Sequence, residues 1–185
     1  MKKSHENLLK AIAGESMARN KYTYYAEIAK KEGQIWISKI FEETADNERA
    51  HAQEELELLN VKVQMTNTYD IHPLGKTLEN LRHASESETY EFGTMYPDFE
   101  KVAREEDEIK IATLFQKISE VEKNHAARYT LLADKLEKNM LYKSDTEIEW
   151  KCLNCGYIYK GKYAPKNCPL CQKPQGWYMA LGATK

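Results

Sequence analysis

The chain has 185 residues, of which 30% are charged, and its formal net charge is −2. A charge so close to neutral argues against nucleic acid binding, which normally needs an excess of Lys and Arg. The sequence contains no apolar run long enough for a membrane span or a secretory signal. We therefore expect a cytoplasmic protein with no membrane partner and, from the length, one core of about 150 residues plus a small second unit.

Apolar residues recur at helical spacing in four segments, residues 6–31, 35–59, 74–103 and 108–137. Pro97 is expected to kink the third helix, because proline lacks a backbone N–H. The intervening stretch after the second helix shows no period and reaches about 43 Å when extended, enough to run the length of a helical bundle. These features predict a mainly α fold, a four-helix bundle with a long crossover.

One motif of the second helix returns in the fourth. Glu48-x-x-His51 recurs as Glu122-x-x-His125, in the same phase relative to the apolar stripe of its helix. A Glu and a His three residues apart lie on one helix face and can hold the same cation. Either motif alone would usually indicate a solvated helix face, so the argument for a metal site depends on the repeat.

Each of the four helices places a glutamate at mid-length on its apolar stripe: Glu15, Glu48, Glu88 and Glu122. Burying ionised carboxylates costs several kcal/mol each unless a positive charge compensates, and no Lys or Arg lies near them on these stripes. Two divalent cations would neutralise the four charges. This predicts a carboxylate-bridged di-metal site, for which iron or manganese suits the donors better than zinc or copper. The alternative is that some of these glutamates point to solvent.

Glu91 breaks the internal repeat, since its counterpart in the first half is Met17. It lies one turn from Glu88 on the same helix face. A fifth carboxylate is useful if the metal charge rises, as when Fe²⁺ becomes Fe³⁺. The alternative interpretation is an ordinary surface glutamate.

All four cysteines lie in two short motifs, Cys152-x-x-Cys155 and Cys168-x-x-Cys171. In a reducing compartment, two such knuckles typically close a tetrahedral metal centre and do not form disulfides. The spacing predicts a metal site but does not identify the metal. A structural zinc ribbon and an electron-carrying iron centre both remain open.

The composition changes near the first cysteine, where Pro and Gly become frequent. We divide the chain into a bundle at residues 1–140, a polar linker at 141–149 and a small cysteine domain of strands and loops at 150–185.

Together these motifs resemble the rubrerythrin family, in which a ferritin-like diiron bundle precedes a rubredoxin-like domain. The matching motifs are Gly14-Glu15-Ser16, Glu43 to Glu48 with His51, Glu88-x-x-Glu91 followed by Met95-Tyr96-Pro97, Glu122-x-x-His125, and the two cysteine pairs with Cys155-Gly156-Tyr157. Gln172 departs from the family pattern, which usually places Gly after the last cysteine. That departure bears on the redox potential more than on metal binding.

The resemblance implies specific ligand roles in the bundle. Glu48 and Glu122 would bridge two irons, with Glu15 terminal on the first iron and with Glu88 and His125 on the second.

It also implies that one iron exchanges a ligand, with Glu91 bound in the oxidised state and His51 in the reduced state. A hard anionic ligand favours Fe³⁺, and neutral imidazole suits Fe²⁺. Tyr22 and Tyr96 match tyrosines that hydrogen-bond the ligand carboxylates, although simple core packing is an alternative.

The activity implied by the resemblance is that of a non-haem diiron peroxidase, which reduces hydrogen peroxide to water. Electrons would come from an NAD(P)H-dependent reductase or a rubredoxin and pass through one iron held by the four cysteines. The reductase must be another protein, because the chain has no nucleotide-binding fingerprint. The resemblance further implies a homodimer. Two alternatives are an iron-handling ferroxidase of the ferritin-like class and a non-redox protein with a structural zinc ribbon.

Overall fold

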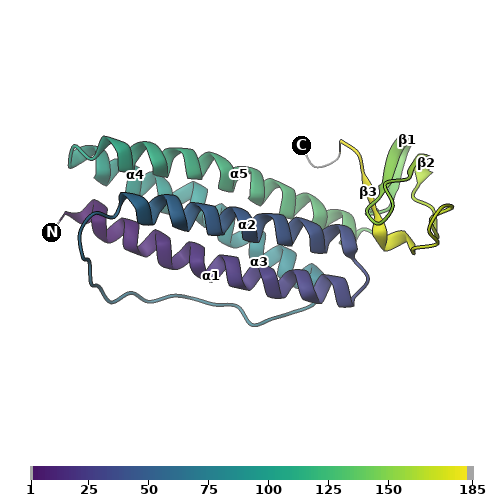
Figure 1. The fold of residues 1–185 in the computed structure, drawn as a ribbon, viewed down its shortest axis with the longest axis horizontal. Coiled ribbons are helices and arrows are strands. Elements are labelled where there is room, and N and C mark those ends of the chain that lie inside the picture. The colour runs from purple at the N-terminus through teal and green to yellow at the C-terminus, as the bar shows by residue number, and fades with distance from the viewer. Residues whose placement is uncertain (1, 183–185) are drawn as a thin grey trace.

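The computed structural model describes residues 2–182, and its helices pair into two antiparallel hairpins (Figure 1). The helices are α1 (Lys3–Lys31), α2 (Ile35–Leu58), α3 (Thr77–Tyr90), the π-helical turn η1 (Glu91–Met95), α4 (Tyr96–Glu105) and α5 (Ile109–Glu137). The first hairpin is α1 with α2, and the second packs α3, η1 and α4 against α5. The predicted mainly α bundle with four long helical rods is confirmed. Within the described residues, no helix is long and apolar enough to cross a membrane.

The crossover covers residues 59–76 and runs along the outside of the bundle (Figure 1). The following helix begins at Thr77 and not at the predicted Leu74, whose side chain is exposed. Side chains of the first helical turn hold the preceding backbone instead. Asn80 bonds both the N–H and the C=O of Gly75 at 2.9 Å, and Glu79 accepts the N–H of Lys76 at 2.7 Å. These bonds compete with another turn of helix and fix its start.

The predicted kink of the third helix takes a different form. A π-helical turn, Glu91–Met95, precedes Pro97, which sits in the first turn of α4. Pro97 has no N–H to bond the carbonyl four residues earlier, and the wider turn takes up the mismatch without breaking the rod. The hydroxyl of Ser119 donates to the carbonyl of Phe92 at 3.2 Å. Helix α5 therefore helps to hold the turn that carries Glu91.

The apolar core has two parts along the bundle. One contains the rings of Tyr22, Phe41 and Tyr129, whose centroids lie 5.1–6.0 Å apart. The other contains Tyr96 and Phe115, 5.7 Å apart. The buried glutamates lie between these two parts, where apolar surroundings make uncompensated charge costly.

The cysteine domain is a three-stranded antiparallel sheet in the order β2-β1-β3. Its elements are β1 (Lys143–Cys152), β2 (Ile158–Tyr163), the 3₁₀ turn η2 (Gln175–Trp177) and β3 (Tyr178–Ala180). The predicted polar linker at 141–149 is therefore wrong for most of its length, because pairing of Lys143, Ile148 and Glu149 with β2 overrides its polar composition. Residues 183–185 of the predicted domain lie outside the described residues.

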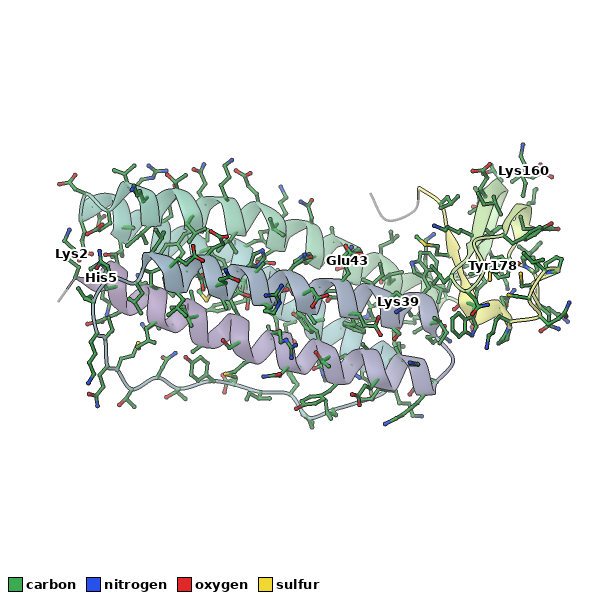
Figure 2. The ribbon with its side chains drawn as sticks, in the orientation of Figure 1. Lys2, His5, Lys39, Glu43, Lys160 and Tyr178 are labelled. Atoms are coloured by element: carbon green, nitrogen blue, oxygen red, sulfur yellow. The ribbon has the colours of Figure 1, made fainter. Side chains whose placement is uncertain are left out.

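The cysteine domain packs against the end of the bundle where α1 turns into α2 (Figure 1). The hydroxyl of Tyr142 donates to Oε1 of Gln34 at 2.8 Å. Trp36 of the bundle and Trp150 of the sheet belong to one continuous buried cluster. In Figure 2, Tyr178 of this domain lies at the opposite end of the molecule from His5.

Candidate metal centres

Four helices bring six of the predicted donors to one buried region. Helix α1 contributes Glu15, α2 contributes Glu48 and His51, α3 contributes Glu88, and α5 contributes Glu122 and His125. The four glutamates are at most 1% exposed. Their helical phase follows the apolar stripes, so the same periodicity that buries the core also buries these carboxylates.

The donors form two overlapping sets. One set is Glu15, Glu48, His51 and Glu122, and the other is Glu48, Glu88, Glu122 and His125. Within each set, the donor atoms all lie within 4.8 Å of one another. Because both sets contain Glu48 and Glu122, two cations held here would be neighbours bridged by these two carboxylates.

Both histidines direct Nδ1 toward the shared carboxylates. Nδ1 of His51 lies 2.9 Å from Oε1 of Glu122 and 3.0 Å from Oε2 of Glu48. Nδ1 of His125 lies 2.7 Å from Oε2 of Glu122. Nε2 of His125 lies 3.3 Å from Oδ1 of Asn47. This contact orients the imidazole ring and leaves Nδ1 available to bind a cation.

The pKa values show how strongly the site needs positive charge. Burial is the main cause that raises the pKa of Glu15 to about 8 and that of Glu88 to about 7. Burial also opposes the ionisation of Glu122, but the close imidazole rings of His125 and His51 outweigh it and lower the pKa of Glu122 to about 2. The carboxylates therefore remain charged only where a cationic group faces them.

Several donor atoms are buried and lack a hydrogen-bond partner among the described residues. They are Oε2 of Glu15, Oε1 of Glu48, Oε2 of Glu88, both carboxylate oxygens of Glu122 and Nδ1 of His125. Buried polar atoms are normally satisfied, and these face one another across the two donor sets. A pair of divalent cations would satisfy them and balance their charge, so the residues fit a di-metal cluster.

Two tyrosines hold the carboxylates from outside, as the resemblance implied. The hydroxyl of Tyr22 donates to Oε1 of Glu88 at 2.5 Å, and that of Tyr96 donates to Oε1 of Glu15. Glu91 stands apart from both donor sets, at the start of η1. Burial and the neighbouring carboxylates, Glu88 first among them, raise its pKa well above the usual value.

Sequence reasoning missed Glu55 of α2. Its side chain is 0% exposed, and its Oε1 lies 3.0 Å from the hydroxyl of Tyr96. The spacing contained the signal, because Glu55 is four residues after His51 and seven after Glu48, on the same helix face. It was hidden among the charged residues that end this helix.

The four cysteines meet in the small domain as predicted. Sγ of Cys152 lies 3.7 Å from Sγ of Cys171, and Sγ of Cys155 lies 3.6 Å from Sγ of Cys168. A tetrahedron with metal–sulfur bonds of about 2.3 Å has edges of about 3.8 Å, which these separations match. All four thiols are free, so the arrangement is that of a metal site and not of disulfides.

The two cysteine knuckles have nearly the same backbone. The N–H of Gly156 bonds the carbonyl of Cys152, and the N–H of Gln172 bonds that of Cys168, both at 2.9 Å. Gly156 has φ 77° and Gln172 has φ 59°. Gln172 therefore occupies the left-handed conformation that glycine adopts at no steric cost.

Comparisons with known proteins match both parts of the chain. The family model described as Rubrerythrin covers residues 6–133, and that of the Rubrerythrin, rubredoxin-like domain covers residues 150–178. Rubrerythrin-1 of Clostridium acetobutylicum is 44% identical over 97% of this chain and 94% of its own length. Rubrerythrin of Nitratidesulfovibrio vulgaris is 36% identical over 97% of this chain and 95% of its own length.

A solved structure of nigerythrin in a mixed-valence state superposes with a TM-score of 0.67. It is 31% identical, and the match covers 97% of this chain and 87% of the nigerythrin chain. The predicted ferritin-like fold is confirmed. So are the two predicted cofactor sites, a diiron site in the Glu/His cluster and a rubredoxin-like site at the four cysteines. The chain belongs to the rubrerythrin family.

Proposed function

We propose that this protein is a non-haem diiron peroxidase that reduces hydrogen peroxide to water and receives electrons through its cysteine site. The observation that carries the proposal is the pair of buried donor sets sharing Glu48 and Glu122, joined in one chain to a tetrathiolate site. Two iron ions held there would supply two electrons, which is the number that peroxide needs: H₂O₂ + 2 H⁺ + 2 e⁻ gives 2 H₂O.

The residues of the bundle would keep that pair of ions in one geometry. Glu48 and Glu122 would bridge, Glu15 would bind the first ion, and Glu88 and His125 would bind the second. Tyr22 and Tyr96 each donate to one terminal carboxylate and so hold its orientation. Burial of the whole cluster excludes bulk water, so its charge interactions are weakly screened.

Glu91 and His51 would exchange on the first iron as its charge changes. The close contacts of His51 with Glu48 and Glu122, and the position of Glu91 outside both donor sets, support an arrangement suited to the reduced site. Glu91 lies on a π-helical turn, a kind of element often found at functional sites. Its raised pKa favours a neutral carboxyl until the cluster gains positive charge.

Electron delivery within one chain would cover a long distance. The cysteine domain contacts the bundle at Gln34, and the helix from there to Glu48 is about 21 Å long. Electron tunnelling falls steeply with distance, so we infer that the cysteine site serves the bundle of a second subunit in a homodimer. An NAD(P)H-dependent reductase or a rubredoxin would reduce the cysteine site.

A surface cavity would give the cysteine site of a second subunit access to the bundle site. It has a volume of about 450 Å³, and its lining comes from α2, through Glu43, and from α5. Figure 2 labels Glu43 on the flank of the bundle. Its lining is Glu43, Val121, Asn124, His125, Ala127, Arg128 and Leu131. His125 is therefore the ligand that an electron donor on this flank would approach first.

Replacing one cysteine tests whether electrons enter the protein through the cysteine site. Cys168→Ser should abolish peroxide turnover driven by the reductase, while the chemically reduced bundle still consumes peroxide. Unchanged reductase-driven turnover in this variant would show that electrons enter elsewhere.

Two other functions remain distinguishable. A ferroxidase that stores iron does not need the appended one-electron site, so it predicts turnover with Fe²⁺ and oxygen that is indifferent to Cys168→Ser. A structural zinc ribbon predicts a colourless protein, because only a ferric tetrathiolate absorbs strongly in the visible range.

A further inference from the structure

The crossover is held to the bundle by few directed contacts. Among the described residues, no hydrogen bond involves the backbone of residues 61–74, and the side chains of Ile71 and Leu74 remain 67% and 57% exposed. His72 is the exception, because its imidazole ring stacks on that of His83 in α3. This pair therefore decides how closely the second half of the crossover lies on the bundle.

The two rings are nearly parallel, with centroids 4.0 Å apart and planes 9° from each other. The side chain of His72 is 48% exposed, whereas Nδ1 of His83 is buried and has no hydrogen-bond partner within residues 2–182. The lone pair of a ring nitrogen lies in the plane of its ring, so two stacked parallel rings do not aim their lone pairs at one ion. Neither histidine belongs to a metal-donor set within the described residues. The pair is therefore a stacking contact and not a further metal site.

The charges around the pair oppose one another. Oε2 of Glu86 in α3 lies 3.4 Å from Nε2 of His72, and both Glu86 and Glu79 of α3 attract a proton to His83. Lys21 of α1 and the ring of His72 repel one. Burial first, and then the charge of His72, lower the pKa of His83 below its usual value. His83 is therefore the ring that resists a proton, while Glu86 stands ready to pair with a charged His72.

The stack tolerates one positive charge but not two. A single imidazolium on a neutral ring gains from the attraction between a cation and a π system, whereas two imidazolium rings 4.0 Å apart repel each other. We propose that His72 and His83 form a pH switch, which holds the crossover on α3 while at least one ring is neutral and releases it when both rings are protonated. No backbone hydrogen bond of residues 61–74, within the part of the chain described, opposes that release.

The lowered pKa of His83 sets the direction of the switch. The contact is fully formed above the pKa of a free histidine ring, about 6.5, and is lost as the pH falls through the lower pKa of the stacked ring.

The release is confined to one segment on one side of the bundle. The bonds of Asn80 to Gly75 and of Glu79 to Lys76 involve neither histidine, so the start of α3 stays in place. His83 lies on the side of α3 that meets α1, where Lys21 bonds Ser87, whereas the cavity beside His125 is lined by α2 and α5. The switch therefore opens the crossover without touching that cavity.

Limited proteolysis of the iron-loaded full chain tests the release. A protease of broad specificity should cut within residues 61–74 faster at about pH 5 than at about pH 8, on either side of the usual histidine pKa. The expected gain is roughly fivefold, because the repulsion of two unit charges about 4 Å apart in water changes an equilibrium by about that factor. Mass spectrometry identifies the cut sites, and circular dichroism checks that the helices persist at both pH values.

His72→Phe is the matched control, because phenylalanine keeps a ring on His83 but takes up no proton. Dividing the wild-type cutting rate by that of His72→Phe at the same pH removes the protease's own pH dependence and any acid effect on the metal sites. This ratio should be near one at about pH 8 and rise roughly fivefold at about pH 5. His72→Ala removes the ring and should be cut fast at both pH values. A ratio near one in acid, or a His72→Ala protein as protected as the wild type at the higher pH, overturns the proposal.

A second measurement follows the proton on His83. Exchange of the imidazole C2 hydrogen for deuterium, read by mass spectrometry at each histidine peptide, reports the pKa of each ring. The pKa of His83 should lie below the usual value in the wild type and rise in His72→Phe, because the facing charge has gone while the burial remains. An unchanged pKa of His83 in that variant overturns the switch. Neither measurement involves peroxide, so a protein that fails to reduce peroxide would refute the proposed function and leave this test valid.

Discussion

Gly176 of the cysteine domain lies directly on the backbone carbonyl of Gly33, where α1 turns into α2. A Cβ added to Gly176 would lie 1.9 Å from that oxygen, far inside contact distance. The small domain can therefore sit on the end of the bundle only because residue 176 has no side chain.

Gly176→Ala should separate the two domains. The clash is with backbone, which cannot move aside as a flexible side chain would, so we expect the docked arrangement to lose about 1–3 kcal/mol. The hydrogen bond of Tyr142 to Gln34 should break with it. Faster hydrogen exchange of the amides around Gln34 would report the loss. Gly14→Ala, with open space around its Cβ, is the matched control and should leave this exchange unchanged.

Mixing two inactive variants should restore activity if electrons pass between subunits. Cys168→Ser keeps a working bundle, and His125→Ala keeps a working cysteine site. In a mixed dimer the intact cysteine site of one chain would face the intact bundle of the other. Peroxide consumption driven by the reductase should rise to a substantial fraction of the wild-type rate after the subunits are exchanged. A mixture as inactive as its components would mean that each chain serves its own bundle.

Gln172→Gly should stabilise the cysteine domain. Gln172 has φ 59°, and the left-handed conformation costs a residue with a side chain about 1 kcal/mol that glycine avoids. The free energy of unfolding of this domain should rise by about that amount. Leu170→Gly, in the same knuckle and without a positive φ, should lower it, because glycine there only adds freedom to the unfolded chain. Equal effects of the two variants would contradict the conformational argument.

Glu106, at the end of α4, caps the start of α1. The stability lost when Glu106 is replaced should depend on pH. Its carboxylate accepts the backbone N–H groups of Lys3 and Ser4 at 2.8 and 2.9 Å. Partial burial acts in the other direction, but these bonds hold the pKa of Glu106 below its usual value. We expect Glu106→Ala to cost about 1 kcal/mol at neutral pH, while Glu105→Ala, an exposed neighbour, should cost little.

The lowered pKa of Glu106 sets the direction in which its stabilising effect changes with pH. The stabilisation is fully present above the pKa of the unfolded chain, about 4.3, and is lost as the pH falls through the lower pKa of the folded state. Chemical denaturation of the wild type and of Glu106→Ala between neutral and acidic pH measures this stabilisation. The difference in unfolding free energy should shrink as the pH falls below about 4. A difference that stays constant over this range would show that the charge of Glu106 is not involved.

The sequence by itself determined the kind of fold and most of the chemistry. Helical periodicity placed Glu15, Glu48, Glu88 and Glu122 on buried stripes, and cysteine spacing predicted the tetrathiolate site, because both depend on contacts that local spacing controls. Tertiary structure decided the rest. Pairing with β2 turned the predicted linker into the first part of β1, and the packing of α4 against α5 and α1 brought Tyr96 to Glu55. Neither contact leaves a local pattern: the polar residues of the linker do not show that a strand will pair with them, and Tyr96 and Glu55 lie on helices far apart in the chain.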